Sequence, residues 1–355
     1  MALSSRFQKS QLKKSDKKNL LLGFCLSCAT VQWLSGWTQH EITEMGSRFT
    51  YREPESHLDS LADELASLAG ISPITAVWGV SEKDNSLVRR LKERGLGSVI
   101  NNNFINESYD LIIARHVMEH APSLPQFLSE LAAKLRPNGY LFLETPDSQD
   151  IFEMGDFSQV WEEHFIYFTS ATLRRALGYH GWHPIKEWRF SAVGVGETPL
   201  GILVKRTQEA IMEFPNPELE FNQIKNFEIK AERLKQNWKC YLTYETQNEK
   251  RLAIFGAGHI TTTFLQLGNL SSFFEIIFDD TPEKIGTLLP GTPLSILATS
   301  EIPSLRITTL VLGVSVQSEG PIIQRLRHEF GWHGDFVSLN PKSPQFPKMI
   351  RDTLD

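Results

Sequence analysis

The stretch YDLIIARHVMEHAPSLPQFLSELAAKLRPNGYLFLE (residues 109–144) decides the fold class. It begins and ends with apolar runs, residues 109–114 and 140–144, that have the length and composition of buried strands. Residues 124–135, between these runs, have the spacing of a helix and precede the helix-ending sequence Arg-Pro-Asn-Gly. A strand, a helix and a second strand of these lengths predict a parallel α/β sheet.

The alternation extends on both sides of this stretch. Upstream, residues 56–70 have helical periodicity, with Ser56 and Asp59 in a capping-box pattern. Downstream, residues 224–241 form an amphipathic pattern, and the apolar run 251–255 opens a second α/β unit. We therefore expect an α/β protein in four parts: an N-terminal segment (1–54), a core (55–206), a connecting helical segment (207–248) and a second Rossmann-like domain (249–355).

Composition excludes several classes of protein. The 355 residues carry 36 Lys and Arg against 42 Asp and Glu, and the net charge of −6 offers no general attraction for nucleic acid. Three cysteines are too few for a disulfide framework, which favours a cytoplasmic location. A Lys-rich start followed by the apolar run 20–26 is similar to a signal peptide but lacks a clean cleavage site. That run is also too short and polar to span a membrane.

Two motifs contain candidate acid/base residues. His116-x-x-Glu119-His120 has the spacing of an inverted zinc-peptidase motif. However, it directly follows a predicted strand, at the edge where α/β sheets bind ligands, so we favour His120 as a catalytic residue over a zinc peptidase. In the second motif, residues 161–168, two glutamates adjoin His164 among aromatic residues. Aromatic surroundings raise a carboxyl pKa, so this motif suggests a general base, with a surface acidic turn as the alternative.

Two further motifs indicate a nucleotide site or a metal site. Gly256-Ala257-Gly258 and an acidic strand end about twenty residues later suggest a dinucleotide-binding unit. The third glycine of that fingerprint is absent, and a tight turn in any Rossmann-like domain would explain the pair. Cys25-x-x-Cys28 is half of a zinc site, and inert thiols are the alternative.

Together and in this order, these segments resemble the S-adenosylmethionine-dependent C-methyltransferases that modify nucleotide-linked 4-keto-deoxysugars. The segments that carry the resemblance are residues 24–33, 49–51, 111–144, 163–169 and 279–293. The most specific is DDTPEKIGTLLPGTP at 279–293, which is similar to the hallmark of the family's C-terminal domain. The resemblance implies a class I methyltransferase core followed by a Rossmann-like domain that does not require NAD.

The resemblance also implies roles for individual residues. The family's active-site residues fall on His120, Glu163 and His164, with Tyr51 as a further match. S-adenosylmethionine would contact Asp84, Asn103 and Phe104, and a nucleotide-linked sugar would lie between the two domains. Cys25 and Cys28 would belong to a zinc module whose upstream half is absent.

Some positions depart from the family pattern, and they leave an alternative open. The family's cofactor loop is acidic-x-Gly-x-Asn-Asp-Gly, whereas residues 79–85 read GVSEKDN, with Asp84 as the match. A strand–helix unit before Tyr109 is shortened, and Trp161 stands where the family commonly has Tyr. The alternative is a methyltransferase-like protein without methyl transfer, serving as a nucleotide-sugar-binding or partner subunit.

Overall fold

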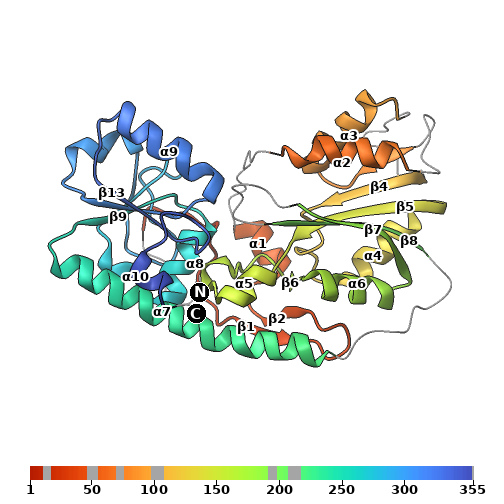
Figure 1. Ribbon diagram of the computed structural model, residues 1–355, viewed down its shortest axis with the longest axis horizontal. Helices are drawn as coiled ribbons and strands as arrows, with labels where there is room; N and C mark the ends of the chain where they lie inside the picture. The colour runs from red at the N-terminus through yellow and green to blue at the C-terminus, as the bar shows by residue number, and fades with distance from the viewer. Residues whose placement is uncertain are drawn as a thin grey trace.

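The computed structural model describes residues 1–10, 17–45, 55–68, 76–96, 108–190, 198–206 and 217–353. These residues form two α/β lobes that lie side by side, and the long helix α7 (Glu218–Gln247) runs along both of them (Figure 1). Within the described ranges, no helix has both the length and the apolar character that crossing a membrane requires.

The first lobe is built on a mixed five-stranded sheet. Its strand order is β3 (Val77–Gly79), β4 (Tyr109–Arg115), β5 (Leu135–Pro146), β8 (Pro199–Arg206) and β7 (Trp182–Arg189). Strands β3, β4 and β5 are parallel, as predicted. The prediction of a wholly parallel sheet is wrong for β8 and β7, because β8 pairs antiparallel with both β5 and β7.

Helices cover both faces of this sheet. Helices α2 (His57–Ala66) and α3 (Asn85–Glu93) pack their leucines against one face, and α4 (Leu124–Ala133) and α6 (Ser170–Tyr179) cover the other. Because β4 is buried from both sides, its central residues are uniformly apolar. The predicted capping box at Ser56 is wrong: Ser56 already has helical backbone angles (φ −60°, ψ −27°), and its side chain makes no capping hydrogen bond.

A small antiparallel sheet lies beneath the first lobe. It contains β1 (Leu21–Phe24), β2 (Val31–Ser35) and the short β6 (Ile166–Tyr167). Its apolar side chains pack against α5 (Gln149–Met154) and partly against α7. The short helix α1 (Gln39–Met45) follows β2.

The second lobe is a Rossmann-like unit whose five strands are all parallel. The order is β11 (Ile296–Leu297), β10 (Ile276–Phe278), β9 (Leu252–Phe255), β12 (Thr309–Leu312) and β13 (Asp335–Ser338). The helices of this lobe are α8 (His259–Gly268), α9 (Val316–His328) and the short α10 (Lys348–Arg351). The second half of α7 contributes Leu234, Trp238 and Leu242 to its core.

Candidate active site between the lobes

The turn after β4 places His120 against the loop that contains Glu163. The Nδ1 atom of His120 lies 2.9 Å from the carbonyl oxygen of Glu163. Because a carbonyl can only accept, Nδ1 must carry a proton and donate it. In neutral His120, the Nε2 atom therefore keeps a lone pair that can accept a proton.

The loop of residues 161–164 brings the second predicted histidine to the first. The ring centroids of His120 and His164 are 4.8 Å apart, and the ring of Trp161 lies 4.7 Å from that of His164. Burial lowers the pKa of His164 well below its ordinary value, so the imidazole is neutral at pH 7. Burial also raises the pKa of Glu163, while a hydrogen bond from Ser5 and the charge of His120 oppose the increase. The structure thus brings together His120, Glu163 and His164, three of the four predicted catalytic residues.

The second lobe adds a third histidine that the sequence reasoning missed. His259 begins α8, and its ring stacks on Trp161 with centroids 4.4 Å apart and planes 16° apart. Burial lowers its pKa to about 4. From the sequence alone, the Gly256-x-Gly258 motif is interpreted only as a nucleotide-binding or turn signal. In the structure, this turn places the next residue, His259, at the edge of the sheet. A polar residue directly after such a turn was the available signal.

Glu162 was also missed, although it belongs to the predicted motif. Its side chain is buried, and burial raises its pKa to about 7. The backbone amide of Ser4 donates to Oε1, whereas Oε2 has no hydrogen-bond partner among the described residues. A carboxyl in this state holds its proton near neutrality and can donate it.

One group of the described residues has the composition of a metal site. Glu119, His120 and His164 each offer a ligand atom within 4.8 Å of the others. However, Nδ1 of His116 lies 3.5 Å from Oε1 of Glu119. Burial disfavours the charge on His116, but Glu119 and Glu144 outweigh it and raise the pKa to about 9. An imidazolium at this position repels a cation, so the cluster is better suited to proton transfer than to holding a metal.

The other end of the same sheet edge contains Asp84, the predicted cofactor residue. Its side chain is fully buried and accepts hydrogen bonds from the Ser81 amide (2.7 Å), the Ser81 hydroxyl (2.9 Å) and the Arg115 amide (2.8 Å). A Cβ on Gly79 would lie 2.7 Å from Cβ of Asp84, so the space beside this glycine is filled by the protein itself. Asp84 is therefore held by protein partners on both of its oxygens, and its role toward S-adenosylmethionine stays a prediction.

Next to Asp84, a buried ionic network follows the ends of β4 and β5. The guanidinium of Arg115 donates to Glu144 (2.9 Å), to Glu55 (2.8 Å) and to the Ser86 hydroxyl (3.1 Å). Glu144 also accepts from His57 and His116, each at 3.1 Å. Although burial opposes ionisation, these partners hold the pKa of Glu144 well below its usual range.

The remaining predicted residues lie elsewhere. Tyr51, Asn103 and Phe104 are outside the described residues. Cys25 and Cys28 flank the turn between β1 and β2, and the described residues bring no third ligand to them. Burial alone would raise the pKa of Cys25, but hydrogen bonds with Cys28 and Ser27 outweigh it and lower the pKa. A zinc ion at this turn is not supported.

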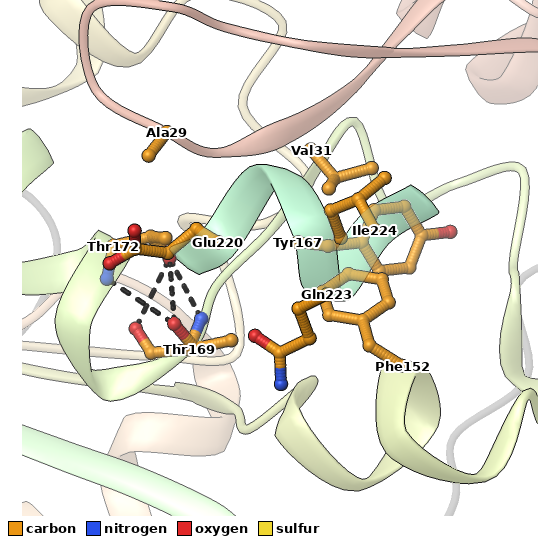
Figure 2. A pocket seen from close by; sticks show the side chains of 9 residues that line it. All are labelled: Ala29, Val31, Phe152, Tyr167, Thr169, Thr172, Glu220, Gln223 and Ile224. Atoms are coloured by element: carbon orange, nitrogen blue, oxygen red, sulfur yellow. Dashed lines mark hydrogen bonds between the residues drawn. The ribbon is translucent and has the colours of Figure 1, made fainter. Parts of the chain in front are cut away.

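A hollow near this small sheet is not a second active site. Nine residues line it, contributed by the β1–β2 region, α5, β6, the start of α6 and α7 (Figure 2): Ala29, Val31, Phe152, Tyr167, Thr169, Thr172, Glu220, Gln223 and Ile224. Most of the lining is apolar, and Thr169 and Thr172 are hydrogen-bonded to each other at the start of α6. The hollow is a packing gap between elements and contains no acid/base pair.

In the second lobe, the predicted dinucleotide features are used internally. Asp279 accepts from the Ala257 amide at 2.7 Å and pairs with the buried Lys284 at 3.3 Å. Gly256 has a φ of 102°, and a Cβ there would lie 2.8 Å from the carbonyl oxygen of Gly313. These contacts account for the presence of a glycine at 256 and an aspartate at 279 without requiring a bound nucleotide.

Comparison with family models gives two adjacent matches. A methyltransferase domain matches residues 23–187, and a C-methyltransferase C-terminal domain matches residues 206–341. The chain is also 30% identical over 71 residues to the C-methyltransferase NovU of Streptomyces niveus. That match covers 20% of this chain and 17% of the relative's length.

Solved structures of methyltransferases are similar to part of this chain only at a low level. A chain of the complex between the Haloferax volcanii Trm112 methyltransferase activator and a putative methyltransferase is 12% identical, with a TM-score of 0.34. The match covers 43% of this chain and 91% of that one. Magnesium protoporphyrin IX methyltransferase of Synechocystis PCC 6803 is 13% identical, with a TM-score of 0.30, and the match covers 43% and 83%. At these scores the two structures say nothing about the chain's activity.

Proposed function

The chain belongs to the S-adenosylmethionine-dependent C-methyltransferase family, and from this premise we propose that it methylates a carbon next to the ketone of a nucleotide-linked deoxysugar. The observation that carries the proposal is the cluster of His120, Glu163 and His164 between the lobes. A carbon next to a ketone must lose a proton before it can attack a methyl group, so this reaction needs a positioned base.

The described side chains supply the groups that such a proton transfer needs. Glu163 takes the proton from the carbon, with Nε2 of His120 as the second acid/base group, and the electron pair moves to the ketone oxygen to give an enolate. The neutral His164, in ring contact with His120, is a nearby group that can donate a hydrogen bond to such an oxygen. S-adenosylmethionine supplies the methyl group when it is bound.

A second candidate function rests on the Asp84 loop. Its carboxylate already accepts three hydrogen bonds from Ser81 and Arg115, so it has little capacity left for a cofactor. This observation favours a protein that keeps the sugar-nucleotide site and has lost methyl transfer. Such a protein would serve as a nucleotide-sugar-binding subunit with a protein partner.

Two measurements on the purified chain separate these functions. The first follows deuterium uptake from D₂O into a thymidine diphosphate-linked 4-keto-6-deoxyhexose by proton NMR, which reports on the base without any cofactor. The second measures binding of S-adenosylmethionine by calorimetry and transfer of its labelled methyl group to the same sugar nucleotide.

We expect deuterium uptake next to the ketone, micromolar binding of S-adenosylmethionine and a methylated product. Sugar-nucleotide binding without heat from S-adenosylmethionine and without product would establish the second function instead. Absence of both deuterium uptake and sugar-nucleotide binding would contradict both.

A further inference from the structure

The first eight residues of the chain lie against both lobes at the candidate active site. The backbone amide of Ala2 donates to Oε1 of Gln266 in α8 at 2.7 Å, and the Leu288 amide donates to the carbonyl of Gln8 at 2.8 Å. Ala2 and Leu3 are fully buried, and Ser4 is 4% exposed. We call residues 1–8 the leading segment.

On the second lobe, the leading segment is held by the loop of residues 279–293. Gln8 and Leu288 form an antiparallel bridge in the middle of this loop. The ammonium of Lys284 lies 5.4 Å from the ring centroid of Phe7, and Asp279 pairs with that ammonium. The loop that most resembles the family's C-terminal hallmark therefore contacts the leading segment directly.

On the first lobe, the leading segment contacts the loop of residues 161–164. The Ser5 hydroxyl donates to Oε1 of Glu163 at 2.9 Å, and the Trp161 indole donates to the Ser4 hydroxyl at 3.0 Å. The Ser4 amide donates to the buried Glu162. Three successive residues of the predicted catalytic loop are thus hydrogen-bonded to two successive serines.

We propose that Ser5 is a positioning residue for Glu163, and that the second lobe acts on the active site by holding the leading segment in place. This inference rests on the proposed role of Glu163 as a base. With Oε1 occupied by the Ser5 hydroxyl, Oε2 is the oxygen left to take up the substrate proton. The hydrogen bond also selects one orientation of the carboxylate before the substrate arrives.

Several charged or titratable groups face Glu163 from the surrounding elements. His120, from the turn after β4, and Glu162, from its own loop, act on it directly. His164 contacts His120, and His259 from α8 stacks on Trp161 of the same loop. The Ser5 hydroxyl stabilises the ionised carboxylate, so its removal raises the pKa of Glu163. A base with a higher pKa is ionised only at higher pH, which moves the acid limb of the rate profile upward.

The test measures deuterium uptake by the same sugar nucleotide as a function of pH. Ser5→Ala is expected to move the acid limb up by about one pH unit and to lower the rate about tenfold below it. Ser5→Thr keeps the hydroxyl and restores the midpoint. Ser10→Ala, at an exposed position just after the leading segment, leaves the profile unchanged. Ser5→Cys carries the same test if the alanine variant is unstable.

An unchanged midpoint in Ser5→Ala, or an equal loss of rate at every pH, would overturn the positioning role. A wild-type chain without deuterium uptake would instead contradict the proposed function. In that case, carbon-13 NMR of labelled glutamates, with Glu163→Gln for assignment, reads the Glu163 pKa directly. A higher pKa in Ser5→Ala supports the inference, and an equal pKa overturns it.

Discussion

The two ends of one sheet edge in the first lobe use their polar side chains in opposite ways. At the Asp84 end, Asp84, Arg115 and Glu144 hydrogen-bond to protein partners on several sides. At the His120 end, His120 lies in ring contact with His164, and Oε2 of the neighbouring Glu162 has no hydrogen-bond partner among the described residues.

This difference separates stabilising polar groups from reactive ones. A buried charge with a full set of partners stabilises the lobe and has little capacity left for a ligand. A buried group without a full set is costly to stability and therefore calls for a functional explanation. The Asp84 end and the His120 end come from the same kind of strand-to-loop junction, so the junction alone does not decide which one is reactive.

The largest expected effect comes from a substitution at the His120 end of the sheet edge. Glu163→Gln removes the proposed base and should lower deuterium uptake by about a thousandfold, within the range for general bases. Sugar-nucleotide binding should change little, because the amide keeps the size of the carboxyl. His57→Gln, at the Asp84 end, is the control and should leave uptake within about threefold. Equal losses in both variants would remove the distinction between the ends.

The next largest effect is a loss of stability from a substitution at the Asp84 end. Arg115→Met leaves Glu144 buried without its guanidinium and should lower the free energy of unfolding by about 3–4 kcal/mol, measured with urea. Arg90→Met is the matched control, since Arg90 pairs with the exposed Asp59 and should cost less than about 1 kcal/mol. A loss in Arg115→Met as small as in the control would show that the network contributes little.

A smaller effect depends on pH. Burial raises the pKa of Glu162 from 4.5 to about 7. The folded state therefore holds this proton more tightly than the unfolded state, and the resulting stabilisation is complete below pH 4.5 and is lost as pH rises through about 7. Glu162→Gln stays neutral and should be more stable than the wild type by about 2 kcal/mol at pH 8, with the difference vanishing near pH 4.5. Urea unfolding at both pH values checks this, with the exposed Glu130→Gln as control. A gain that is the same at both pH values would contradict the raised pKa.

The smallest effect concerns Trp161. Trp161→Phe removes the hydrogen bond to the Ser4 hydroxyl but keeps a ring beside His164 and His259, so it should cost about 1 kcal/mol of unfolding free energy. Chemical denaturation measures the change. A loss above about 3 kcal/mol would mean that the indole supports the loop by more than this bond.

The sequence predicted most of the fold because the strands and helices are strongly patterned. The apolar run of residues 109–114 has the length and composition of a buried strand, and α7 extends the amphipathic pattern that was seen from Ile224 to Tyr241. The direction of β8 was not predictable, because a strand buried on both faces has the same composition in either orientation.

For the site, local motifs led to His120, Glu163 and His164, whose grouping the geometry supports and whose roles stay predictions. The contacts of His259 with Trp161 and of Ser5 with Glu163 were not predictable, since these pairs are 98 and 158 residues apart and only the packing of the lobes brings them close. For Asp84, a sequence match could not show the hydrogen bonds that its carboxylate makes to Ser81 and Arg115, and its role toward a cofactor stays a prediction.

The helix α7 has a consequence for how the molecule can move. Its 30 residues span about 45 Å, with Phe227 stacked edge-on against Phe152 of the first lobe and Trp238 within the core of the second. A continuous helix that packs against one lobe with each of its halves resists bending between the two contact regions. We therefore expect the two lobes to keep a constant separation along the helix, so that any movement between them is a rotation about its long axis rather than a bend across it.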